Sequence, residues 1–141
     1  MRANSNKFRF VIALLILVSV TVSCSKFSGI LNTENKLYFC ESYDQTKGEI
    51  GKSDKFTTGT LTVMVDLRPK KEKIGVTDVD LNITDTHKNE VVNTIPFTVD
   101  KNMDYIFFNN VNFDKPGSYK VSLLKKDGTV VVSGLVDIVV K

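Results

Sequence analysis

The chain has 141 residues, of which 42% are hydrophobic and 25% are charged, a composition that excludes a disordered or collagen-like chain and fits a single domain. Its formal net charge is +3, but Arg2, Lys7 and Arg9 lie in the first 23 positions, which contain no acidic residue. The remainder balances 16 basic against 16 acidic residues, and this argues against nucleic-acid binding, which needs a clustered positive surface.

The first 23 residues have the pattern of an export signal. Three basic residues lead into an apolar run over 10–22, and a small residue, Ser23, ends the segment. As a helix the run would span roughly 20 Å, which is short of the ~30 Å hydrocarbon core of a bilayer. The sequence therefore favours a signal helix, removed between Ser23 and Cys24, over a transmembrane anchor.

The end of this segment resembles the lipobox of bacterial lipoproteins, here Val20-Thr21-Val22-Ser23-Cys24. Thr21 stands where that family prefers Leu. The resemblance implies cleavage before Cys24 and acylation of its sulfur by fatty acids such as palmitate; the alternative is plain secretion with an ordinary thiol. Residues 24–35 would then be the lipidated Cys and a polar tether. Lys26, where an Asp would favour inner-membrane retention, resembles the outer-membrane default, so we expect a bacterial outer-membrane lipoprotein.

Residues 36–141 are predicted to form an all-β domain of seven strands. Short β-branched and aromatic runs are separated by Gly, Asn, Asp and Pro, at 36–43, 57–67, 76–85, 90–99, 103–112, 118–125 and 129–140. Alternation of apolar and polar residues indicates antiparallel sheets with one buried face, and Asp127-Gly128 predicts a tight hairpin. Seven short strands in about a hundred residues favour an immunoglobulin-like antiparallel β-sandwich.

A local motif adds to this prediction. The stretch from Phe113 to Val121 resembles the corner before the sixth strand of immunoglobulin-like and fibronectin-like domains, in which Gly117 would turn the chain and the Tyr119 hydroxyl would bond to nearby backbone. Val121 replaces the second Cys of antibody domains, which implies the disulfide-free branch. The alternative is a generic Pro-Gly turn. Segments 37–41 and 56–59 are also similar to parts of small spirochaete-type lipoproteins.

Motifs for chemistry are incomplete in this sequence. Gly51-Lys52-Ser53 ends like a phosphate-binding loop, but Thr46 stands where the leading Gly belongs. A calcium-like start at Asp78 fails because Ile83 occupies the position of the required Gly, and the single His87 gives no zinc set and no catalytic base. We therefore expect no enzyme, no catalytic residue, no cofactor and no metal. Cys40 is expected to be a buried thiol in a monomeric domain.

Two functions remain open: a surface-displayed module that binds a protein partner of unknown identity, and a periplasm-facing structural or assembly subunit of an envelope complex. The candidate binding element is a long polar loop at 44–55, since loops of this length are uncommon unless they are functional or disordered. If it is a loop, a short Gly-Ser linker should replace 45–53 with little effect on folding. Its candidate residues are Asp44, Lys47, Glu49, Lys52, Asp54 and Lys55.

Overall fold

The computed structural model describes residues 33–141, so the predicted signal helix, the cleavage site and Cys24 lie outside the described residues. This part of the chain is all-β, with one 3-10 turn, η1 (Arg68–Lys70). Its strands are β1 (Lys36–Cys40), β2 (Ser42–Asp44), β3 (Gly48–Ile50), β4 (Lys55–Thr57), β5 (Gly59–Asp66), β6 (Asp78–Asp85), β7 (Glu90–Thr98), β8 (Tyr105–Phe113), β9 (Gly117–Lys125) and β10 (Val130–Val139).

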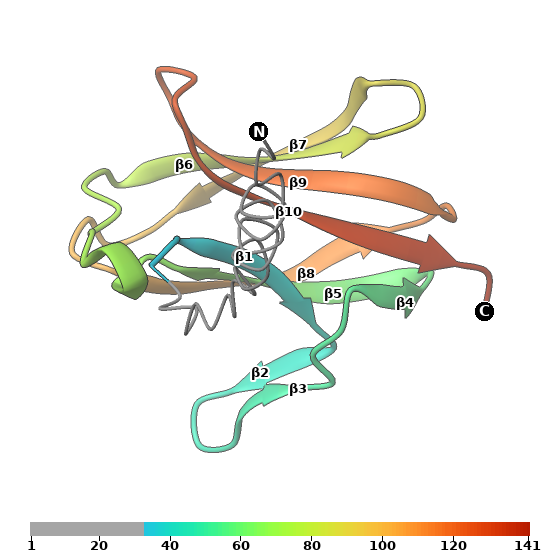
Figure 1. Cartoon of the computed structure of the whole chain (residues 1–141), viewed down its shortest axis with the longest axis horizontal. Coiled ribbons are helices and arrows are strands. Elements are labelled where there is room, and N and C mark those ends of the chain that lie inside the picture. Colours follow the sequence, from blue (N-terminus) through green and yellow to red (C-terminus); the bar gives the residue numbers. More distant parts are fainter. Residues whose placement is uncertain (1–32) are drawn as a thin grey trace, which may run out of the picture. The chain divides into compact units, whose positions relative to one another are not determined.

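Two larger sheets form the body of the domain (Figure 1). One has five strands in the order β4-β10-β9-β6-β7, and the other has three in the order β1-β5-β8. Neighbouring strands are antiparallel except for β4 and β10, which are parallel. A separate hairpin, β2–β3, lies beside the three-stranded sheet. Strands β7 and β8 are therefore sheet edges.

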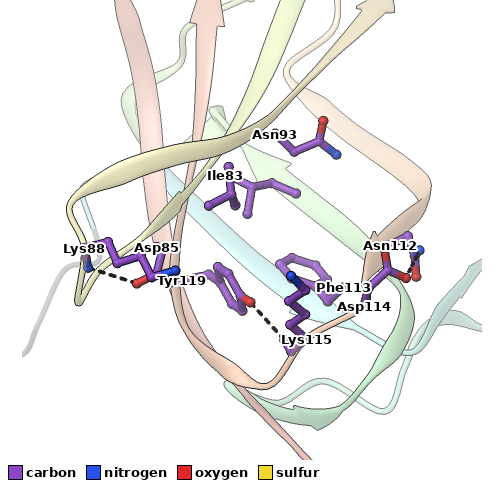
Figure 2. A pocket seen from close by; sticks show the side chains of 10 residues that line it. Ile83, Asp85, Lys88, Asn93, Asn112, Phe113, Asp114, Lys115 and Tyr119 are labelled. Atoms are coloured by element: carbon purple, nitrogen blue, oxygen red, sulfur yellow. Dashed lines mark hydrogen bonds between the residues drawn. The ribbon is translucent and has the colours of Figure 1, made fainter.

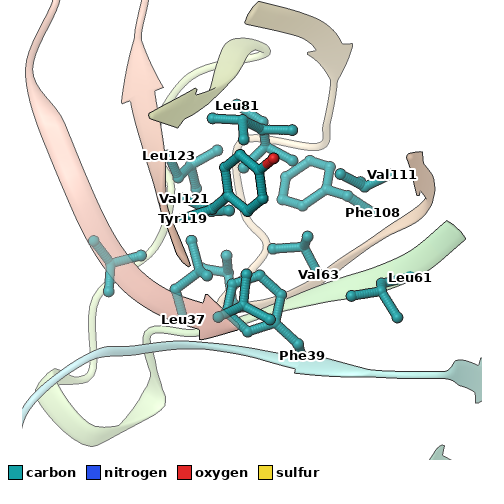
Figure 3. Close-up of a cluster of buried hydrophobic side chains, with 14 of the residues drawn as sticks. Leu37, Phe39, Leu61, Val63, Leu81, Phe108, Val111, Tyr119, Val121 and Leu123 are labelled. Atoms are coloured by element: carbon teal, nitrogen blue, oxygen red, sulfur yellow. The ribbon is translucent and has the colours of Figure 1, made fainter. Parts of the chain in front are cut away.

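The main core lies between the inward faces of the two larger sheets (Figure 3). Successive side chains of a strand point to opposite faces, so an alternating sequence buries every second residue. On β6, Val79, Leu81 and Ile83 are buried. Removal of this apolar surface from water drives the two sheets together. The cluster includes Leu37, Phe39, Leu61, Val63, Leu81, Phe108, Val111, Tyr119, Val121 and Leu123.

The last five predicted strands occur within two residues of their expected ends, whereas the first half of the chain differs. The segment predicted as strand 57–67 divides at Thr58, because β4 pairs with β10 in one sheet and β5 lies in the other. The segment predicted as strand 36–43 divides at Glu41 into β1 and β2. The predicted loop at 44–55 is wrong as a loop: it contains the turn and second strand of the β2–β3 hairpin and the start of β4.

The N-terminal end of the described chain lies at one pole of the domain. Lys36 opens β1 opposite Asp66, the last residue of β5, and Glu34 forms an ion pair with Lys70 of η1 at 2.7 Å. Because neighbouring strands are antiparallel, the β6–β7 and β8–β9 turns lie at the opposite pole, which we call the distal pole. A tether that leads to residue 33 would therefore join the domain at the η1 pole.

Candidate functional site: the β2–β3 hairpin and the sheet face beneath it

The β2–β3 hairpin covers the outer face of the three-stranded sheet. Tyr38, Met64 and Phe107 lie side by side on neighbouring strands of this face. Met64 and Cys40 are fully buried although neither belongs to the main core. The hairpin and its neighbours thus enclose a second, smaller cluster, and we call this covered surface the hairpin face.

Pairing within the hairpin decides which side chains turn toward the sheet. Tyr43 lies directly opposite Glu49, so both side chains point to the same face of the hairpin. The Tyr43 ring stacks on Phe107 with centroids 4.6 Å apart, and it meets the edge of Tyr105 at 6.2 Å. Ile50 lies on the other face and remains 40% exposed. One side of the hairpin is therefore fixed to the sheet, while the other faces solvent.

Glu49 is the polar centre of the hairpin face. Its Oε1 accepts hydrogen bonds from the hydroxyls of Tyr38 and Tyr105, whose oxygens lie 3.2 Å apart. The Lys52 ammonium lies 3.9 Å from Glu49 Oε2 and 3.9 Å from the centroid of the Tyr38 ring. The Arg68 guanidinium lies 4.0 Å from the centroid of the Tyr105 ring. Two phenols and the Lys52 ammonium thus surround the Glu49 carboxylate, and Arg68 packs on the ring of one of these phenols.

Asp66 fixes the position of the Arg68 guanidinium. Both of its carboxylate oxygens accept hydrogen bonds from this side chain, each at 2.7 Å, a bidentate geometry that orients the planar group. This bonding lowers the pKa of Asp66 and raises that of Arg68. Asp66 consequently holds the Arg68 guanidinium over Tyr105, and this group is not free to turn toward another side chain.

The hydrogen bonds at Glu49 shift the pKa values of the groups involved. Burial alone would raise the pKa of Glu49, but the two phenol donors and the positive charges of Lys52 and Arg68 outweigh burial and lower it. Burial, followed by the hydrogen bond to Glu49, raises the pKa of Tyr38 well above its ordinary range, and the same causes raise that of Tyr105. The favoured state is an ionised Glu49 between two neutral tyrosines.

The structure brings together only two of the six candidate residues, Glu49 and Lys52. Asp44 instead stabilises the turn of its own hairpin, since its Oδ1 accepts the N–H groups of Thr46 and Lys47 at 2.8 Å each. Lys47 is exposed at the tip of the hairpin.

The remaining two candidates belong to the β4 region, away from the hairpin tip. The backbone carbonyl of Asp54 accepts the N–H of Asp137 on β10 at 2.8 Å. Lys55 is the first residue of β4, and its N–H donates to Ser53 Oγ at 3.1 Å. Both are therefore fixed by their main chains to the edge of the five-stranded sheet, and they form no common site with Glu49.

Four aromatic residues of the hairpin face were missed from the sequence. Tyr38 and Tyr43 lie near the predicted loop, whereas Tyr105 and Phe107 are distant along the chain. A signal was present in β8, where Tyr105-Ile106-Phe107-Phe108 is an unbroken apolar run. Such a run indicates a strand covered on both faces, and it could have shown that something lies over the outer face of this sheet.

Cys40 is a free and buried thiol, as predicted. Its Sγ lies 3.9 Å from the carbonyl oxygen of Thr62. Burial, followed by the negative charge of Glu49, raises the pKa of the Cys40 thiol. A protonated thiol beneath the hairpin is a poor nucleophile, so this residue supplies packing and no reactive group.

The predicted hydrogen bond at Tyr119 is present at the distal pole. Tyr119 Oη donates to the backbone carbonyl of Lys115 at 2.9 Å, and its ring packs at 5.4 Å from Phe113 (Figure 2). Gly117, two residues before Tyr119, is the first residue of β9. The bond secures the turn between β8 and β9 to the strand that follows it.

No group of three or more His, Cys, Asp or Glu residues within residues 33–141 is arranged to hold a metal ion. In the same part of the chain no helix combines the length and apolarity needed to cross a membrane. No protein-family model matches the chain, and no curated protein matches it.

Proposed function

We propose that this protein is a membrane-anchored lipoprotein that displays a non-catalytic β-domain and binds other proteins through the solvent-exposed side of the β2–β3 hairpin. The supporting observation is the fixation of one side of the hairpin by Glu49 and Tyr43, while Lys47 and Ile50 remain exposed. A protruding element that is already ordered loses less conformational entropy on binding than a flexible loop does.

We also propose that the domain has an immunoglobulin-like fold without a disulfide. Two observations support this finer assignment. The sheets have five and three strands in the orders β4-β10-β9-β6-β7 and β1-β5-β8, and Tyr119 bonds to Lys115 at the corner before β9. In such folds the strands form a rigid frame and the loops and hairpins carry recognition.

The membrane attachment in this proposal is a lipid on Cys24. The acyl chains would hold the protein on the bacterial outer membrane, and a tether over 24–35 would lead to the η1 pole. Nine residues of this tether precede residue 33, and a random coil of that length would span roughly 15–18 Å, at ~5–6 Å times the square root of its length. This distance is enough to lift the domain clear of the lipid headgroups and to leave the hairpin accessible at the cell surface.

The binding proposal is tested on the exposed side of the hairpin. Proteins captured by crosslinking to the full chain on intact cells are identified first. The double variant Lys47→Glu/Ile50→Ser changes only outward-facing side chains, and we expect it to lower capture of the same partner at least about tenfold, ~1.4 kcal/mol. Lys101→Glu/Val130→Ser makes matched changes at exposed positions near the η1 pole and should bind normally. Equal capture by both variants would contradict the assignment of the hairpin.

The anchor and its location need separate measurements. Cys24→Ala should abolish metabolic labelling with a radioactive fatty acid and move the protein out of the detergent phase; unchanged partition would refute the lipid anchor. Protease added to intact cells should cleave the displayed domain. Protection in intact cells, followed by cleavage after the outer membrane is opened, would favour the alternative of a periplasm-facing structural subunit.

A further inference from the structure

A second candidate site lies at the distal pole, where a pocket of about 270 Å³ opens between β7 and β8 (Figure 2). Its inner wall consists of the buried residues Ile83, Phe113 and Tyr119, and Val92 lines its side. Pockets for drug-sized ligands typically run from about 300 to 1,000 Å³. The size of this pocket therefore suits one large apolar side chain.

The pocket lies where β7 and β8, the edge strands of the two sheets, face each other. Phe97 of β7 packs against Phe108 of β8 with ring centroids 4.7 Å apart, and this contact fills the space between the two edge strands toward the η1 pole. Farther along β7, on the same face, Asn93 lies opposite Ile83. The register of β7 then shifts at Val92, which is 52% exposed. A polar amide and a β-bulge thus replace the apolar residues that would otherwise fill the space.

The acidic and basic side chains at the mouth of the pocket differ in the number of their bonding partners. Asp85 Oδ1 accepts the N–H groups of His87 and Lys88 at 2.9 and 3.1 Å, and Asp114 Oδ1 accepts from Asn112 Nδ2 at 2.6 Å (Figure 2). In contrast, the ammonium groups of Lys88 and Lys115 have no carboxylate within 4.0 Å among residues 33–141. Both carboxylates keep their negative charge and are held in their own turns by neutral N–H donors, while the two ammonium groups, which lack a carboxylate partner there, are free to turn toward a ligand.

We propose that this pocket binds an apolar side chain that lies next to acidic residues in a segment of a partner protein. The apolar wall would receive the side chain, and Lys88 and Lys115 would face the flanking carboxylates. Protein-binding hot spots are apolar or aromatic anchors buried in well-packed pockets, and complementary charges beside them steer the partner and fix its register. This site is separate from the hairpin face, and it lies at the distal pole, opposite the η1 pole.

The test uses the full chain in detergent micelles and the tripeptide acetyl-Glu-photoleucine-Glu-amide, whose diazirine side chain forms a covalent adduct on irradiation. Adducts are mapped by mass spectrometry of proteolytic fragments. We expect saturable labelling of fragments that carry residues 83–93 and 112–119. An otherwise identical probe with Lys in place of both Glu residues should label them at least about tenfold less, because its charges oppose those of Lys88 and Lys115. Unlabelled acetyl-Glu-Leu-Glu-amide should compete, whereas acetyl-Glu-Ser-Glu-amide should not.

Two variants connect the labelling to the pocket without disturbing the fold. Lys88→Glu/Lys115→Glu should reverse the charge preference of the probes, because it replaces both cations with carboxylates. The fold should persist, because these two residues bond to Asp85 and Tyr119 through their main chains. Val92→Ser should lower labelling several-fold, while Val130→Ser, at a position 56% exposed on β10, should not. Labelling spread over the surface, an equal response to both probe charges or competition by the Ser peptide would each overturn the proposal. Blockage by N-acetyl-leucine but not by the Leu tripeptide would also overturn it, in favour of a small organic acid.

Discussion

The role assigned to Glu49 can be tested by its removal. Glu49→Ala deletes the acceptor of two phenol hydrogen bonds that join the β2–β3 hairpin to β1 and β8. A hydrogen bond to a charged group contributes about 1.5–3 kcal/mol. The Glu49 side chain is 23% exposed, so water partly replaces the lost partners. We therefore expect the pair to contribute about 2–3 kcal/mol in total to the closed hairpin.

Amide hydrogen exchange measures this free energy locally. A loss of 2–3 kcal/mol should speed exchange within 41–53 by roughly 30- to 150-fold, because each 1.36 kcal/mol is a factor of ten. The N–H of Glu41, which bonds to the Ile50 carbonyl at 2.9 Å, is a direct reporter at the base of the hairpin. Thiol labelling of Cys40 should accelerate by a similar factor, since the hairpin covers it. Amides in the centre of β6 and β9 should exchange as before.

The controls separate the charge from the contact. Glu49→Gln keeps an acceptor but no charge, so its effect should be about half as large in free energy. Glu90→Ala removes an exposed carboxylate from the first residue of β7 and should leave the hairpin amides unchanged. If Glu49→Ala accelerates exchange uniformly in all strands, or not at all, the hairpin is not an element held separately by Glu49.

Three further predictions concern the same structure. Because the pKa of Glu49 is lowered in the folded chain, its contribution to stability is complete above about pH 4.3, the ordinary pKa of Glu. This contribution is lost as the pH falls through the folded pKa. Tyrosine fluorescence should therefore show the hairpin opening in acid before the core unfolds. Tyr119→Phe should lower the free energy of unfolding by about 0.5–1.5 kcal/mol and Tyr119→Ala by ~3–5 kcal/mol, as measured by thermal melting. An unchanged melting temperature for the Ala variant would refute the structural role of Tyr119 at the turn before β9. Gly134→Ala should destabilise by about 1–3 kcal/mol in urea, because the added Cβ would collide with the Leu37 carbonyl oxygen.

The strands that were predictable from sequence are those whose two faces differ. Along β6, apolar and polar residues alternate, and this period fixes both the strand and its buried face. The Tyr119 bond was also accessible, because its partner Lys115 lies only four residues earlier and the turn itself brings the two together. Local patterns suffice where the structure is determined by neighbours along the chain.

The hairpin could not be predicted in this way. Its strands have three residues each, which is too short for a period to be visible, and Asp44 and Gly48 are residues typical of turns. Its position depends on Glu49 meeting Tyr105, 56 residues away along the chain. The division between β4 and β5 has a similar cause, since the pairing of β4 with β10 is also a long-range contact. Hydrophobic periodicity carries no information about either partner.

These contacts change the expected result of removing the hairpin. A flexible loop over 45–53 could be replaced by a short Gly-Ser linker at little cost, but the hairpin covers Met64, which is fully buried, and supplies Glu49. Exposure of a Met side chain costs about 1.5–3 kcal/mol, and the loss of the Glu49 bonds adds to this cost. Burial terms of this kind are upper estimates, so we expect a net loss of about 3 kcal/mol, near the lower end of this sum.

Thermal melting distinguishes the two expectations. At about 4 °C for each kcal/mol in a domain of this size, the excised chain should melt roughly 12 °C lower. Lys47→Glu/Ile50→Ser should melt normally, because it alters only the exposed side of the hairpin. A melting temperature within about 2 °C of the parent chain would show that the hairpin adds nothing to stability. A large decrease would mean that any loss of binding after excision must be judged with the double variant, in which the fold beneath the hairpin is intact.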